Sequence, residues 1–153
     1  MRRTISVTVL AAALAAVVIG SGLASGRGGP TSITLHLTSK LEHASYVDNA
    51  PQGRSAGDVL IFTEKLLDAH GHTVGSDAAS CTYLFDRRSL CSGAYALAKG
   101  RIMVQLVQPG PTGAYTQAIT GGTGRYAGAT GTVKVDQHPG ADQFTFRIRL
   151  LAP

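Results

Sequence analysis

Apolar and polar residues alternate along much of the chain beyond residue 32, which is the pattern of strands with one buried face. Ile33–Thr38 places apolar residues at every second position, and Phe144–Leu150 repeats the pattern with Phe144, Phe146, Ile148 and Leu150 on one face. Further segments rich in β-forming residues lie at 58–66, 74–84, 90–97, 101–107, 115–120 and 130–135. The pattern therefore predicts seven or eight short strands.

Turn-forming residues separate these segments. Asp48–Gly57, Asp68–Thr73, Pro109–Gly113 and Gly121–Gly124 are rich in Gly, Pro, Asn, Asp or Ser. No stretch after the first 24 residues has the apolar period of an amphipathic helix. Many short strands without helices indicate a β-sandwich or a β-barrel, and a closed barrel leaves no exposed strand edge.

The first 24 residues differ in pattern from the rest of the chain. Arg2 and Arg3 precede an almost wholly apolar run, Ile5–Ile19, and small residues follow up to Ala24. This order is typical of a secretory signal peptide, and the run is short for a membrane span. We expect residues 1–24 to be cleaved, 25–32 to be a flexible leader and 33–153 to be one domain of a secreted protein; an uncleaved anchor is the alternative.

Composition and charge fit one small globular domain. The chain has 153 residues, of which 44% are hydrophobic and 15% charged. Cleavage after Ala24 would remove Arg2 and Arg3 and no acid, which lowers the formal net charge from +5 to +3. The basic residues are scattered, and their largest adjacent set is Arg87–Arg88 in a predicted turn. We therefore expect no nucleic-acid partner, and no membrane contact after cleavage.

Two cysteines flank one predicted hairpin. If the chain turns about Asp86, Cys81 and Cys91 face each other on the same side of the two strands. Export to an oxidising compartment favours a disulfide between them, and a reactive thiol in a pocket is the alternative.

Three motifs resemble functional sites but lack the context that those sites need. Gly53–Gly57 matches G-x-S-x-G, yet a loop precedes it and a strand follows it, so no nucleophile elbow is expected. Gly121–Gly128 is followed by no Walker-type Lys-Ser/Thr pair, and it is better interpreted as a turn than as a phosphate loop. His70-Gly71-His72 has no third ligand nearby, and we predict no metal site and no cofactor.

Three blocks resemble one family. They are GDVLIFTEKL at Gly57–Leu66, TVGSDAASCTYL at Thr73–Leu84 and YTQAITGGTGRYAGATGTVKV at Tyr115–Val135. Their order and spacing are similar to those of the allene oxide cyclase barrel. The segment GGTGRYAGATG within the third block also resembles the glycine-rich segment of dirigent proteins. The resemblance covers about residues 33–150.

This resemblance implies an all-β fold, an eight-stranded antiparallel β-barrel with a mostly apolar interior cavity, often assembled as a homotrimer. Members of the class bind reactive or flexible small molecules and steer a cyclisation or a coupling. A secreted, cysteine-paired chain looks like the bacterial branch of the class. The physical logic is that an apolar cavity holds a substrate near its reactive shape while a few polar groups place charge or a proton.

The family's catalytic residues carry over only in part. Glu64 stands where allene oxide cyclases have a water-holding Asn after a Phe-Thr pair. Cys81 matches the cysteine of the third strand, and residues 35–40 contain no acid where the plant enzymes carry a glutamate. We therefore expect the fold to be shared and the allene oxide substrate not to be.

Glu64 is the catalytic candidate, as a general acid or base with a pKa raised by burial. If it faces inward, so do Phe62, Leu60 and Asp58, because strand side chains alternate; a position in water at the barrel rim is the alternative. The further pocket candidates are tyrosines that could donate phenolic hydrogen bonds or simply pack: Tyr83, Tyr95 and Tyr115.

Three functions fit the sequence. The first is a secreted cyclase or isomerase acting on a small, largely apolar metabolite, with Glu64 as its acid–base group. The second is a non-catalytic barrel that binds or guides such a ligand. The third is a structural or interaction protein at the cell surface.

Overall fold

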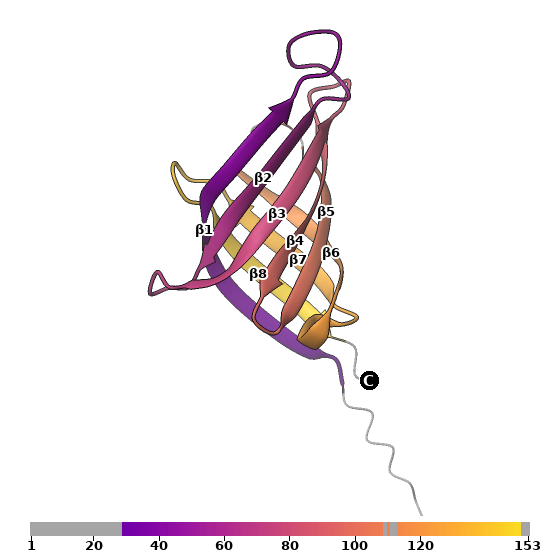
Figure 1. Ribbon diagram of the computed structural model, residues 1–153. Helices are drawn as coiled ribbons and strands as arrows, with labels where there is room; N and C mark the ends of the chain where they lie inside the picture. The colour runs from indigo at the N-terminus through magenta and orange to yellow at the C-terminus, as the bar shows by residue number, and fades with distance from the viewer. Residues whose placement is uncertain (1–28, 109, 111–112, 151–153) are drawn as a thin grey trace, which may run out of the picture.

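A computed structural model shows a closed barrel of eight antiparallel strands (Figure 1). The structure describes residues 29–108, 110 and 113–150, so the expected signal peptide lies outside the described residues. The strands are β1 (Thr31–Val47), β2 (Val59–Leu67), β3 (Thr73–Tyr83), β4 (Ser89–Leu97), β5 (Gly100–Gln108), β6 (Ala114–Gly122), β7 (Thr130–Asp136) and β8 (Gln143–Leu150). The predicted eight-stranded antiparallel barrel is confirmed.

The first strand closes the barrel. Its first half pairs with β8 and its second half with β2, with a register shift between Leu41 and His43. The strand is much longer than the predicted Ile33–Thr38, and Thr31 and Ser32 of the expected leader already belong to it. The alternation fades after Thr38, where the side chains are mostly exposed, and pairing with β2 extends the strand to Val47.

The cysteine hairpin has the predicted register. Cys81 on β3 lies opposite Cys91 on β4, and the two form a disulfide with Cα atoms 4.0 Å apart. Leu84 N–H donates to the Arg88 carbonyl at 2.8 Å, which closes the turn about Asp86.

One end of the barrel interior is filled by apolar side chains. Inward residues of six strands, the short 3-10 helix η1 (Gly124–Tyr126) and Ala129, which follows η1, form a buried cluster. Its members at most 1% exposed are Leu66, Tyr95, Ile102, Ala129, Val133, Val135, Phe146 and Ile148. The Tyr95 ring packs edge-on against Phe144 and Phe146, with ring centroids 5.5 and 4.8 Å away. Because these side chains are in van der Waals contact, this end is a packed core and not a channel.

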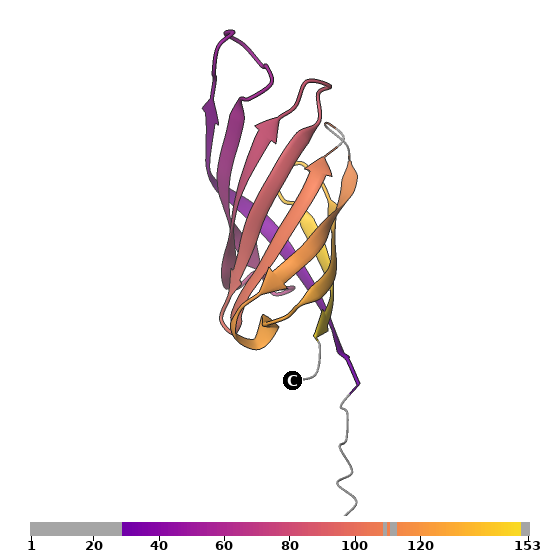
Figure 2. The same ribbon diagram turned by 90° about the vertical axis from the view of Figure 1, so that its right-hand side faces the viewer.

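The two ends of the barrel differ in their loops (Figure 2). The β1–β2 loop and the β3–β4 turn extend from one end, and η1 lies at the other. There the glycine-rich segment between β6 and β7 packs closely: a Cβ at Gly124 would lie 2.5 Å from the Lys99 carbonyl oxygen. The segment thus turns the chain from β6 to β7, as predicted. The end of the barrel at η1 is called the closed end, and the opposite end the open end. In the described part of the chain, no helix is long and apolar enough to span a membrane.

Candidate functional site

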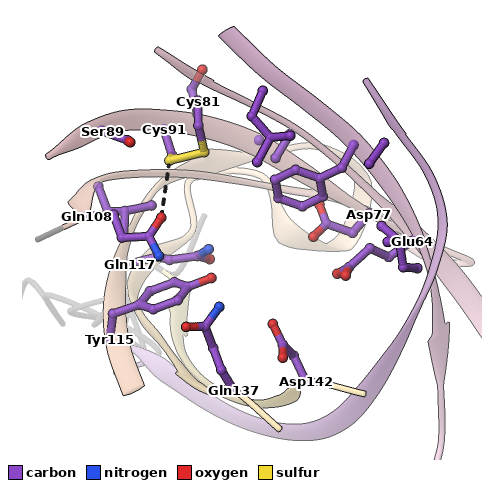
Figure 3. Close-up of a pocket in the computed structure, with 18 of the residues that line it drawn as sticks. Glu64, Asp77, Cys81, Ser89, Cys91, Gln108, Tyr115, Gln117, Gln137 and Asp142 are labelled. Atoms are coloured by element: carbon purple, nitrogen blue, oxygen red, sulfur yellow. Dashed lines mark hydrogen bonds between the residues drawn. A yellow bond between two sulfur atoms is a disulfide. The ribbon is translucent and has the colours of Figure 1, made fainter. Parts of the chain in front are cut away.

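The open half of the barrel interior contains a cavity of about 270 Å³ (Figure 3). Its apolar lining comes from β1, β2, β3, β5 and β8, and its largest members are Leu60, Phe62 and Phe144. Its polar lining consists of the side chains Glu64, Asp77, Tyr83, Ser89, Ser92, Gln108, Tyr115, Gln117, Gln137 and Asp142. Apolar and polar side chains therefore share the lining, and β2 and β3 contribute both kinds.

Two carboxyl groups stand opposite each other on neighbouring strands. Glu64 of β2 pairs in register with Asp77 of β3, and both side chains line the cavity. Burial and the nearby Glu64 charge raise the pKa of Asp77 to about 7, against the Ala78 backbone hydrogen bond. Burial also raises the pKa of Glu64, although Ser39 donates a hydrogen bond to it. At pH 7 Asp77 is therefore about half protonated.

A third carboxyl group enters the cavity from the β7–β8 connection. Burial raises the pKa of Asp142, while hydrogen bonds from the His138 backbone N–H and the Gln137 side chain oppose the rise. Tyr115 of β6 also lines the cavity, and burial raises its pKa, so it remains a hydrogen-bond donor at neutral pH. The carboxylates of Glu64 and Asp142 and the Tyr115 hydroxyl point toward the same open space (Figure 3).

The polar floor of the cavity rests on the packed core. The Tyr95 hydroxyl donates a hydrogen bond of 2.7 Å to Gln117 Oε1. Tyr95 is fully buried, and burial raises its pKa well above the ordinary value. Gln117 faces the cavity, so Tyr95 fixes the orientation of a lining residue without lining the cavity itself.

The disulfide forms part of the cavity wall. Cys81 and Cys91 both line the cavity, and Cys91 Sγ lies 3.8 Å from Gln108 Oε1. A disulfide sulfur has no proton to donate, so this is a contact between two lining side chains and not a hydrogen bond. No cysteine in the described part of the chain is free.

The β1–β2 loop is anchored at the mouth by a buried carboxylate. Asp58 accepts hydrogen bonds from the Tyr46 hydroxyl and from the backbone N–H groups of Asn49 and Ser55. The Tyr46 bond is the main reason that the pKa of Asp58 is lowered. The Arg54 guanidinium lies 4.7 Å from the ring centroid of Tyr83, whose side chain lines the cavity. The loop is therefore tied to the rim.

Most of the expected pocket residues meet in this cavity. Glu64, Leu60, Phe62, Tyr83 and Tyr115 all line it, and Glu64 lies inside the barrel and not at its rim.

Two of the expected pocket residues do not line the cavity. Asp58 precedes β2, and its buried carboxylate accepts hydrogen bonds from Tyr46 and from the β1–β2 loop. Tyr95 is one layer deeper, in the core. The expected apolar lining is also incomplete, because three carboxyl groups face the space.

Sequence reasoning missed Asp77, Asp142 and the glutamines. The position of Asp77 was available from parity, since it lies four residues before Cys81 and therefore on the same face of the strand. Asp142 lies outside the strands, where alternation gives no direction.

The other tempting motifs are structural. Ser55, in Gly53–Gly57, lies in the β1–β2 loop and bonds Asp58. His70 and His72 lie in the β2–β3 turn, where both backbone N–H groups donate to the Asp68 carboxylate. Across the described residues, no group of three or more His, Cys, Asp or Glu side chains could hold a metal ion.

Comparisons with known proteins agree with the barrel. Residues 33–150 match the family model described as the allene oxide cyclase barrel-like domain. A solved structure named pyocyanin demethylase superposes with a TM-score of 0.68 at 27% identity, over 75% of this chain and 99% of that chain. Among the curated proteins, no sequence matches.

Two further solved structures show the fold alone at low identity. A Diels–Alderase from Streptomyces koyangensis superposes with a TM-score of 0.65 at 13% identity, over 82% of this chain and 71% of that one. A pterocarpan synthase dirigent protein has a TM-score of 0.65 at 12% identity, over 82% of this chain and 88% of that one. The family match spans more than three quarters of the sequence, and the chain belongs to the allene oxide cyclase barrel-like family.

Proposed function

We propose that the barrel binds a small metabolite in its open-end cavity and catalyses its isomerisation or cyclisation by proton transfer through Glu64 and Asp77. The observation that carries the proposal is the register: two carboxyl groups face each other inside the cavity, and one of them has a pKa of about 7. A group that titrates near the working pH is suited to general acid–base catalysis.

The proposed step conserves protons. The ionised member of the pair takes a proton from a C–H, N–H or O–H group of the bound metabolite. The protonated member returns a proton to another atom of the same molecule, so bonds shift within the substrate and nothing is oxidised or reduced. The apolar wall at Leu60 and Phe62 holds the carbon frame, and Tyr115 and Gln117 supply hydrogen bonds that orient it.

Base-catalysed ring opening of a nitrobenzisoxazole tests the pair without knowledge of the natural substrate. In this probe reaction a base removes a ring C–H proton, the N–O bond breaks, and a coloured cyanophenolate forms. We expect the rate to rise with pH as Asp77 ionises near pH 7. We expect Glu64→Gln and Asp77→Asn each to reduce the rate at least about tenfold.

The pH profile separates the two roles. Glu64→Gln removes the like charge that raises the Asp77 pKa, so the midpoint of the remaining activity should move to lower pH. Asp136→Asn is the matched control, because Asp136 lies outside the cavity and pairs with Lys134 at 2.9 Å. A Glu64→Gln/Asp77→Asn double variant that keeps the wild-type rate would overturn the proposal.

Pyocyanin is the first natural compound to test for binding, since the pyocyanin demethylase shares 27% identity over 99% of its length. The Diels–Alderase and the pterocarpan synthase support the choice of ring-forming substrates next. Bound ligand without turnover in all of these assays would favour a non-catalytic, guiding barrel.

We also propose that the protein acts after export and assembles as a homotrimer. The apolar run at Ile5–Ile19 and the Cys81–Cys91 disulfide support export. Mass spectrometry of the exported protein should find Ser25 at its N-terminus, and light scattering should give three times the monomer mass. An N-terminus at Met1 or a monomer mass would contradict the respective part.

A further inference from the structure

The side chains that line the cavity carry charge of one sign only. Glu64, Asp77 and Asp142 line it, and among the described residues no Lys, Arg or His does. The chain as a whole has a formal net charge of +5, so the acidic lining does not follow from composition. The lining is acidic although the chain is positively charged overall. The charge of the lining therefore indicates which charge a ligand must carry.

The protein gives these carboxyl groups only neutral hydrogen-bond donors. Ser39 donates to Glu64, the Ala78 backbone N–H to Asp77 and the Gln137 side chain to Asp142. In all three groups, burial is the largest cause of the raised pKa, and it outweighs these donors. Burying an ionised carboxylate without a countercharge costs free energy. Without a bound cation, the cavity therefore favours the protonated forms of these acids.

Two basic groups contact the lining residues from outside the cavity. Arg54 stacks on Tyr83 from the β1–β2 loop, and His138 acts on Asp142 from the β7–β8 connection. The remaining titratable groups facing the acids are tyrosines, Tyr83 and Tyr115 in the lining and Tyr95 beneath it. None of these tyrosines supplies a positive charge.

We propose that the ligand of this cavity is a small organic cation, a protonated or quaternised nitrogen base on an apolar or aromatic frame. The inference rests on the proposed function, for which it names the substrate class. The cation supplies the countercharge that the lining lacks, and its frame lies against Phe62, Phe144 and the disulfide. A ligand with a carboxylate or phosphate would add like charge and is excluded.

The size of the cavity limits the frame. About 270 Å³ lies just below the usual range for small-molecule sites, so the frame is one to a few fused rings and not a long chain. Three bicyclic probes of one shape and different charge therefore test the proposal: N-methylquinolinium (cation), methylnaphthalene (neutral) and naphthoate (anion).

Calorimetric titration of the disulfide-bonded protein measures the three affinities. At about pH 8 we expect the cation to bind at least about tenfold more tightly than the neutral probe, and the anion most weakly. At about pH 5 the preference should shrink, because Asp77 is then protonated. Asp77→Asn and Asp142→Asn should each lower the ratio of cation to neutral affinity, while Asp136→Asn should leave it unchanged.

Each outcome has one meaning. Equal binding of the cation and the neutral probe, tighter binding of naphthoate, or no binding of any probe would overturn the cation proposal. Preferential cation binding without turnover of the benzisoxazole would support this inference and contradict only the proposed catalysis. Turnover of the benzisoxazole without preferential cation binding would support the proposed catalysis and contradict the cation proposal.

Discussion

The two halves of the barrel interior come from the same strands and are filled in opposite ways. At the closed end the inward side chains include Leu66, Val133 and Phe146, all 0% exposed. At the open end the same rows reach a cavity lined by acids and amides. The packed half stabilises the fold, and the hollow half is free to carry chemistry at some cost in stability.

The change from core to cavity occurs within single strands. On β2 the inward row passes from Leu66 to Glu64, and on β6 it passes from Ile119 to Gln117. Each of these steps is two residues long, which keeps the side chains on the same face of the sheet. The composition of each inward row, and not a change in fold, therefore sets where the cavity begins.

Truncation of one phenylalanine in each half should show the largest contrast. Phe146→Ala leaves an enclosed void in the core and should cost about 3–5 kcal/mol of unfolding free energy. Phe62→Ala only enlarges an existing cavity and should cost about 1–2 kcal/mol. Urea denaturation of both variants measures the difference. Equal costs would mean that the open half is packed as tightly as the core.

Replacement of Asp77 in the open half should stabilise the protein, whereas truncation of either phenylalanine destabilises it. The pKa of Asp77 is raised from 3.8 to about 7, so the folded state binds the proton more tightly and wild-type stability should fall as pH rises from about 4 to 7. Asp77→Asn should therefore be more stable than wild type at about pH 8, by up to about 4 kcal/mol, and about equal to it near pH 4.

Denaturation curves across this pH range check the prediction. Burial also raises the pKa of Glu64 and Asp142, so some slope should remain in the variant. Asp136→Asn tests whether loss of any acid has the same effect. Parallel stability curves for wild type and Asp77→Asn would show that Asp77 is not desolvated.

The sequence was informative where alternation is strong. Alternation with a period of two predicted the last strand, and the turn about Asp86 predicted that Cys81 lies opposite Cys91. The same alternation predicted that Phe62 and Glu64 lie on one face of their strand. Each of these inferences depends only on local geometry within a strand or a hairpin. The barrel itself followed from the resemblance, because pattern alone does not distinguish a barrel from a sandwich.

The parts that the sequence did not reveal depend on contacts between distant segments. The pairing of Glu64 with Asp77 needs the β2–β3 register, which a bulge near Leu66 and Leu67 shifts. Asp58 fits the parity of β2, but its hydrogen bond to Tyr46 makes it a loop anchor. Asp142 reaches the cavity from outside the strands. Alternation carries no information about such long-range placements.

Loss of the disulfide should lower the free energy of unfolding by a smaller amount. Cys81→Ala/Cys91→Ala removes a link across a short loop, which contributes about 3 kcal/mol on the chain-entropy model. The barrel should remain closed, because β3 and β4 also pair with β2 and β5. Urea denaturation of the variant, and of wild type with a reductant, measures the loss. Unchanged stability in both would contradict a structural role.

The smallest effect is expected for Tyr46→Phe, which should loosen the β1–β2 loop without changing the stability of the barrel. Tyr46→Phe removes the hydroxyl that donates to Asp58, while the backbone N–H groups of Asn49 and Ser55 still donate. Amide exchange in the β1–β2 loop should become about fivefold faster, with no change in the core strands. Because the Tyr46 bond lowers the pKa of Asp58, wild type should lose this anchor as pH falls below about 4, and the variant should show less of that acid sensitivity. Faster exchange in β7 and β8 as well would mean that the mouth and the core unfold as one unit, and that the two halves are not independent.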